Sequence, residues 1–183
     1  MKSLQNHALG LLLAASVSAL PLAASAATYQ FSQSGYADGA TVSGSFTGAD
    51  LDHDGQISSF AGEISAFMMT FSGNGAVPGF SHGLAQLSGL IYTVGNSTLG
   101  ADLSGGVEGM ASNWGGSTGY DFASGQGPTG NDGGRIIDTA TGATTSTREL
   151  IKISPVPEPS SALLLLAGLG LMGAASRRRS RRS

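Results

Sequence analysis

Glycine interrupts the middle of this chain every few residues, and this limits the folds that the chain can adopt. The sequence has 29 glycines in 183 residues, about twice the usual share of about 7%. Short runs rich in β-branched and aromatic residues lie between the glycines, and no run in residues 27–155 keeps a helical period. Glycine destabilises helix interiors. The pattern therefore argues against a helical bundle and a coiled coil.

Seven runs have the composition of β-strands, separated by turn-like segments at the intervals of a sandwich. They cover residues 28–32, 41–47, 63–72, 87–94, 120–123, 135–139 and 149–153. The run 63–72 is apolar at odd and even positions, which predicts a central strand covered on both faces. Residues 104–134 hold three Gly-Gly pairs and predict long flexible loops or a loose sheet edge. The predicted fold class is all-β: a small antiparallel β-sandwich with Gly-rich loops.

The N-terminus has the features of a secretory signal peptide. Lys2 precedes an apolar run over residues 8–22, and the small residues Ala24 and Ala26 follow it. Signal peptidase accepts small side chains at these two positions, so we expect cleavage after Ala26. The alternative is an uncleaved anchor, but Pro21 breaks the run, which is shorter than the ~20 residues of a span.

The C-terminus predicts a second membrane segment. Val156, Pro157, Glu158 and Pro159 precede an uncharged stretch over residues 160–176 that is rich in Leu, Ala and Gly. The stretch is at the short end of the length that spans a bilayer. Five arginines follow it and would stay on the cytoplasmic side: Arg177, Arg178, Arg179, Arg181 and Arg182.

This tail resembles the PEP-CTERM sorting signal of Gram-negative bacteria. The Pro-Glu-Pro core at 157–159, the short span and the arginine cluster occur in the order and spacing of that family. The resemblance implies that exosortase, a membrane enzyme similar to cysteine proteases, removes the tail, and that the producing strain makes exopolysaccharide and biofilm. The same tail is also labelled as the C-terminal domain of ice-binding proteins, but the likeness concerns sorting and location. The alternative is a simple uncleaved anchor.

The sequence thus divides into a signal peptide (1–26), an exported β-rich domain (27–155) and a sorting signal (156–183). The domain holds 11 acidic residues and three basic ones, Arg135, Arg148 and Lys152, for a net charge of −8. Such a surface repels nucleic acid and suits divalent cations. The chain has no cysteine, which fits an export route where folding does not depend on oxidation.

One acidic segment is a candidate calcium loop. Asp50, Asp52 and Asp54 alternate, Gly55 follows, and the Gln56 carbonyl is available. The segment resembles the first eight positions of an EF-hand or dockerin loop, but Ala61 stands where the bidentate Glu belongs. Glu63, two residues later, would have to complete the shell with another loop or with water. The alternative is a solvated acidic turn between two strands.

Catalytic patterns are weak, and we expect a protein that is not an enzyme. The string from Gly115 to Gly119 satisfies G-x-S-x-G around Ser117, but its flanks lack the strand and helix of a nucleophile elbow. His53 and His82 are the available bases in residues 27–155.

Two further patterns have ordinary structural explanations. Thr139, Thr141, Thr145 and Thr147 form two Thr-x-Thr pairs around Gly142, which are typical of a β-hairpin and too few for an ice-binding array. Trp114, Tyr120 and Phe122 can form a platform for sugar rings or tie a glycine-rich loop to the core.

The sequence therefore predicts an exported surface or matrix protein that signal peptidase and exosortase process. Before processing, its C-terminal helix holds it in the inner membrane. It would then take a structural role at the cell surface or in the extracellular matrix, associated with exopolysaccharide or biofilm. A calcium-dependent carbohydrate-binding module is the alternative, and an exported hydrolase is the third hypothesis.

Overall fold

The computed structural model describes residues 25–100, 108–127, 130, 133–156 and 168, and these residues form two packed antiparallel sheets. The elements are β1 (Ala27–Gln33), η1 (Ala37–Gly39), β2 (Val42–Gly48), β3 (Gln56–Ser58), β4 (Ile64–Phe71), β5 (Phe80–Gly83), η2 (Leu84–Gln86), β6 (Leu87–Thr93), β7 (Thr98–Leu99), β8 (Gly109–Ser112), β9 (Tyr120–Ser124), β10 (Gly134–Asp138), β11 (Thr144–Thr147) and β12 (Ile151–Pro155). The all-β prediction is confirmed.

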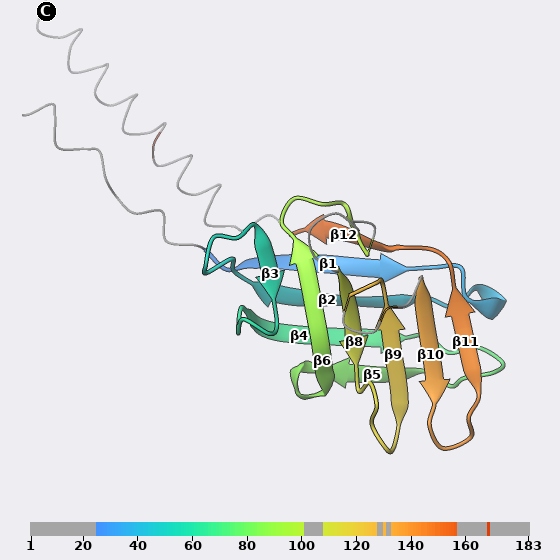
Figure 1. Ribbon diagram of the computed structural model, residues 1–183. Coiled ribbons are helices and arrows are strands. Elements are labelled where there is room, and N and C mark those ends of the chain that lie inside the picture. The colour runs from blue at the N-terminus through green and yellow to red at the C-terminus, as the bar shows by residue number, and fades with distance from the viewer. Residues whose placement is uncertain (1–24, 101–107, 128–129, 131–132, 157–167, 169–183) are drawn as a thin grey trace, which may run out of the picture.

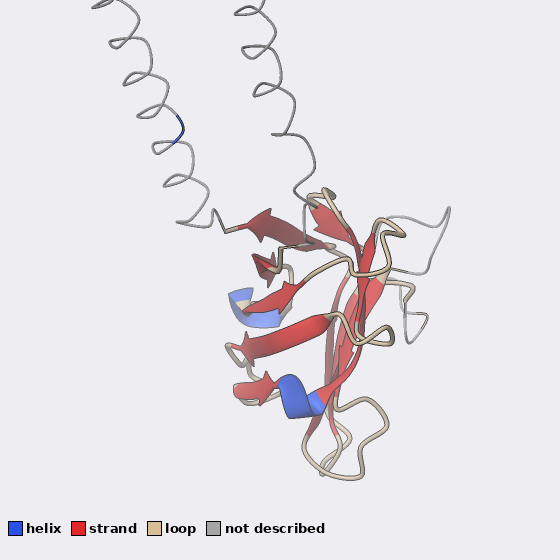
Figure 2. Cartoon of the chain, turned by 90° about the vertical axis from the view of Figure 1, so that its left-hand side faces the viewer, coloured by secondary structure: helices blue, strands red, loops and turns tan. Residues whose placement is uncertain are grey.

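Each sheet has six strands. The first has the order β5-β4-β2-β1-β12-β7 and the second the order β11-β10-β9-β8-β6-β3. Figure 1 shows the strands of the two sheets crossing steeply, and Figure 2 shows the sheets as two layers. Side chains alternate along a strand, so one face of each sheet supplies the core between the layers.

Aromatic side chains fill much of that core. Tyr29 stacks on Phe46 with 5.0 Å between ring centroids, and both rings meet Tyr92 of the second sheet edge-on. The Phe31 ring occupies the space beside Gly44, where a Cβ would lie in contact with it. The backbone carbonyl oxygen of Met68 on β4 lies closer still to that position. A glycine is therefore required at this position of β2 for packing, because any side chain would displace the neighbouring strand as well as the ring.

Strand β4 corrects one prediction. Phe67, Met69 and Phe71 face the core, but Met68 is 60% exposed and Ala66 is also exposed. The strand lies next to the edge strand β5 rather than at the sheet centre. The expectation that both faces are covered is wrong, because a two-layer sandwich leaves the outer face of each sheet to solvent.

The glycine-rich region gives the second correction. Within its described part, β8 and β9 lie in the middle of the second sheet, and every residue of both strands except Tyr120 is buried. Ala111 and Ala123 face each other across the pair. The strand predicted at 120–123 is confirmed as β9, whereas the small side chains of β8 give no strand signal. These side chains let the backbone pack closely, so β8 and β9 form neither a loose edge nor a flexible loop.

The two ends of the described domain meet in the first sheet. β1 pairs with β12, and the backbone N–H of Val156 donates a 2.8 Å hydrogen bond to the carbonyl oxygen of Thr28. Figure 1 shows that β1 begins and β12 ends on the same side of the domain. The predicted last strand, 149–153, is shifted, since β12 continues to Pro155.

No helix among the described residues is long and apolar enough to cross a membrane. The predicted signal peptide up to Ala24 and, apart from Gly168, the predicted span at 160–176 lie outside the described residues, as do Pro157, Glu158, Pro159 and the five arginines. The domain boundaries stay predictions.

Candidate functional site

The acidic loop between β2 and β3 folds around its own carboxylates. Asp50 accepts hydrogen bonds from the backbone N–H groups of Asp54 (3.1 Å) and Gly55 (3.0 Å). Asp52 also accepts from the Asp54 N–H at 3.2 Å, and Asp54 accepts from the Gln56 N–H at 2.7 Å. These side-chain-to-backbone bonds are typical of Asp in tight turns. They hold the loop in one conformation in which the first two carboxylates converge.

Glu63 closes the loop from the other side. Its side chain is only 4% exposed, and its two carboxylate oxygens accept hydrogen bonds from the N–H groups of Leu51 (2.7 Å) and Ser58 (2.8 Å). A buried carboxylate needs such partners. Glu63 thereby joins the acidic loop to the end of β3, although it lies two residues beyond the position that a calcium loop predicts.

Three of the five predicted metal ligands come together. Asp50, Asp52 and Glu63 each offer a carboxylate oxygen, and these oxygens lie within 4.8 Å of one another. A carboxylate oxygen that accepts one N–H keeps a second lone pair, so the cluster can hold a metal ion. Asp54 is on the same loop but is not part of this group, and Gln56 is the first residue of β3. Calcium takes six to eight oxygens, so other ligands would have to complete its shell.

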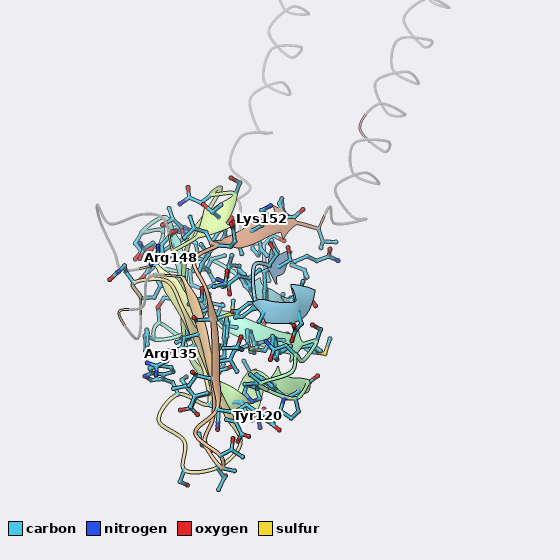
Figure 3. All side chains as sticks on the ribbon, turned by 90° about the vertical axis from the view of Figure 1, so that its right-hand side faces the viewer. Tyr120, Arg135, Arg148 and Lys152 are labelled. Atoms are coloured by element: carbon cyan, nitrogen blue, oxygen red, sulfur yellow. The ribbon has the colours of Figure 1, made fainter. Side chains whose placement is uncertain are left out.

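The aromatic residues do not share one surface. The Tyr120 ring stacks on Phe80 of the first sheet, with 4.6 Å between centroids, and Phe122 is fully buried. Trp114 is half-buried in the loop after β8, and its backbone N–H donates to the Ser88 hydroxyl at 2.9 Å. Figure 3 shows Tyr120 at the opposite end of the domain from Lys152. Tyr120 and Phe122 thus serve packing between the sheets, and the sugar-platform prediction depends on Trp114.

A buried Ser-His pair, which sequence reasoning missed, joins the two sheets. Nδ1 of His82 on β5 lies 2.8 Å from Oγ of Ser112 on β8, and the Ser112 hydroxyl donates to the sulfur of Met69 at 3.1 Å. Which of the two atoms donates depends on the tautomer of the imidazole. Ser112 is fully buried, so the pair is a link between sheets.

Burial sets the protonation of this histidine. His82 is 8% exposed, and its ring packs on Phe80 with 4.8 Å between centroids. Loss of solvation lowers the pKa of His82, while the carboxylate of Asp121 opposes this shift. The neutral imidazole is therefore favoured. Ser117, the serine of the G-x-S-x-G string, is exposed in the loop before β9.

The four threonine hydroxyls all bond within the domain, one of them inside the β10–β11 hairpin and three to neighbouring segments. Thr141 donates to Asp138 at 2.7 Å, Thr145 accepts from the Asn74 amide at 2.9 Å, and Thr147 donates to the Ser34 carbonyl at 2.8 Å. The Thr139 hydroxyl donates to the Gly119 carbonyl at 2.8 Å. The hairpin explanation fits this pairing of β10 with β11.

Comparison with known proteins identifies the tail. Residues 155–180 match the family model of the PEP-CTERM protein-sorting motif. No curated protein and no solved structure matches the chain. The prediction of a PEP-CTERM tail is confirmed, and the motif implies an exported protein that is held in the membrane until exosortase processes it.

Proposed function

We propose that the two-sheet domain is a non-enzymatic component of the cell surface or extracellular matrix, where it is associated with exopolysaccharide or biofilm. The observation that carries this proposal is the PEP-CTERM motif at residues 155–180, which begins where the last strand of the domain ends. The motif implies that the protein is exported and processed, and the two-sheet domain is the part that remains after processing.

The chemistry of the domain supports a structural role. Every buried side-chain nitrogen and oxygen among the described residues has a hydrogen-bond partner, and the buried Ser112–His82 pair serves packing. The three basic residues lie apart on the domain, as Figure 3 shows. Eleven acidic residues against three basic ones give the domain a net negative charge, which favours solubility and contact with divalent cations in the matrix.

The test follows the full chain in a strain that makes exosortase and in the same strain without it. We expect a shortened form in the matrix fraction of the first strain and a full-length, membrane-bound form in the second. An identical full-length form in both strains would support the uncleaved anchor instead. Retention of the shortened form on exopolysaccharide would assign the matrix role, and its recovery in the free medium would argue against that role.

A calcium-dependent carbohydrate-binding module is the second candidate. The convergence of Asp50, Asp52 and Glu63 favours it. Calcium bound there would stiffen the loop between β2 and β3, with Asp54 and Gln56 as further ligands. Retention on exopolysaccharide that disappears with a chelator and returns with calcium would support this candidate.

Trp114 provides the matched test of sugar contact. Trp114→Ala should abolish retention if the indole contacts the glycan, whereas Tyr92→Phe, which changes a residue of the core, should leave retention unchanged. An exported hydrolase is the third hypothesis. Turnover of a polysaccharide or ester that is lost in Ser117→Ala would favour it over both binding roles.

A further inference from the structure

We infer that residues 154–156 detach from β1 during sorting and that exosortase binds them together with the Pro-Glu-Pro core. This inference rests on the proposed processing by exosortase and adds to it a part of the folded domain. It is drawn from the overlap between the sorting motif and the last strand. The motif match begins at Pro155, and Pro155 is the final residue of β12.

No spacer separates the folded sheet from the sorting core. Pro155 lies opposite Tyr29 in the register of β12 with β1, and Val156 donates its N–H to the Thr28 carbonyl. Pro157 is the next residue. An enzyme that binds Pro157 and Glu158 therefore has to come within a few residues of the paired ends of β12 and β1.

Enzymes that bind a short segment of a substrate commonly hold it as an extended strand through backbone hydrogen bonds. The residues upstream of the core are already extended, but their backbone groups pair with β1 instead. The Val156 N–H already donates to the Thr28 carbonyl and cannot serve both partners fully, so an enzyme that binds this group requires residues 154–156 to leave β1.

The burial pattern of β12 shows where such detachment would stop. Ile151 and Ile153 are buried in the core, whereas Ser154 and Pro155 are exposed. The Ile153 N–H also donates to the Ser97 carbonyl at 2.8 Å, and β7 pairs with β12 only at Ile151 and Lys152. Beyond Ile153, the strand is thus paired with β1 on one side only, and the side chains of Ser154 and Pro155 do not enter the core. Its end can separate while the core stays intact.

The experiment uses a disulfide, because the chain has no cysteine of its own. Gln30 lies directly opposite Ser154, and Ser32 directly opposite Lys152. Opposite residues of an antiparallel pair are about 4.5–5.5 Å apart, within the range that a disulfide bridges. Gln30→Cys/Ser154→Cys cross-links the end that should detach. Ser32→Cys/Lys152→Cys is the matched control, since it joins the same strands on the side that should stay paired.

Each full-length variant is produced in the exosortase-positive strain, and the shortened form is followed by pulse-chase and immunoblotting. Oxidation of each pair is checked by thiol labelling. Because cleavage of a transiently open segment follows the population of the open form, we expect release of the Gln30–Ser154 cross-linked chain to be at least about tenfold slower. The control cross-link should leave the rate unchanged. Insertion of Gly-Ser-Gly-Ser between Ser154 and Pro155 should restore release of the cross-linked chain.

The outcomes separate this inference from the function on which it rests. Release of the unmodified chain at the same rate as both cross-linked variants would overturn the inference and leave exosortase processing in place. Equal slowing by both cross-links, without rescue by the inserted residues, would also overturn it, because rigidity elsewhere would then be the cause. An unmodified chain that is never shortened would overturn the proposed processing itself, and the inference with it.

Discussion

The Tyr36 hydroxyl donates a 2.7 Å hydrogen bond to Oε1 of Gln33, three residues earlier in the chain, and both side chains are buried. The amide nitrogen of Gln33 in turn donates to the Ser124 hydroxyl at 2.8 Å and to the Glu149 carbonyl at 2.6 Å. One glutamine of the first sheet thus satisfies polar groups from both layers and from the segment that precedes β12.

Replacing this glutamine should destabilise the domain. Gln33→Met keeps much of the volume but leaves the Tyr36 hydroxyl and the Glu149 carbonyl without their partner. An unpaired buried polar group costs about 1–3 kcal/mol, and we expect a loss of that order in the free energy of unfolding, measured with urea. The control is Gln30→Met on the exposed face of the same strand. Equal urea midpoints of unfolding for the two variants would show that the hydrogen-bond network of Gln33 contributes nothing to stability.

The same network explains the glycine at position 134. A Cβ on Gly134 would overlap the Tyr36 hydroxyl and the Gln33 amide oxygen, so Gly134→Ala should cost about 1–3 kcal/mol, as overpacking does. Gly83→Ala serves as the control, because its Cβ would lie 3.7 Å from the nearest atom. Adding Tyr36→Phe should recover part of the loss at 134. Strict additivity of the two changes would contradict the assigned contact.

Stability should fall in mild acid because of His82. The folded state lowers the pKa of this histidine from 6.5, chiefly through burial. The unfolded chain then binds more protons than the folded one as the pH drops below about 6.5, so the contribution is complete above that pH and is lost below it. His82→Gln should remove this slope, which for one proton is at most about 1.4 kcal/mol per pH unit. Parallel stability curves for wild type and variant between pH 7.5 and 5 would refute the prediction.

His53→Asn is the control for that experiment. His53 lies in the exposed acidic loop with φ of 62°, a conformation that Asn tolerates. We expect the variant to keep the acid sensitivity of the wild type. The same dependence can be followed by titrating the imidazole resonances by NMR.

Calcium should raise the unfolding temperature if the carboxylate cluster binds it. A ligand at 100 times its dissociation constant adds about 2.7 kcal/mol to the free energy of unfolding. Asp52→Asn should reduce the calcium effect while leaving the metal-free domain nearly as stable, since Asp52 is exposed. Glu149→Gln, an exposed acid at another place, should keep the full effect. A calcium response equal in both variants, or none in the wild type, would leave the loop as an acidic turn.

The longer strands were predictable and the shorter ones were not. Runs such as 28–32 and 41–47 carry enough β-branched and aromatic residues to be recognised, and they became β1 and β2. β3, β5, β7 and β8 have two to four residues each, too few for alternation to stand out, and β11, equally short, is indicated only by its Thr-x-Thr pair. In β8 the small residues that permit close packing are also those that carry no strand signal.

Site residues could likewise be predicted where they lie close together in the sequence and not where they lie far apart. Asp50 and Asp52 were recognisable because their spacing lies within one loop, and Glu63 because it follows closely. The Ser112–His82 pair and the Gln33–Ser124 bond join residues 30 and 91 positions apart. Only the packing of the two sheets brings such residues together, and a single sequence gives no register between sheets.

The pairing of the first strand with the last one also fixes when the domain can fold. β1 lies between β2 and β12, so the first sheet stays incomplete until residue 155 is available to pair with β1. Contacts between distant parts of the chain slow folding, and here they cannot begin to form early. The first sheet therefore gains its last long strand only together with the residues that lead into the sorting tail.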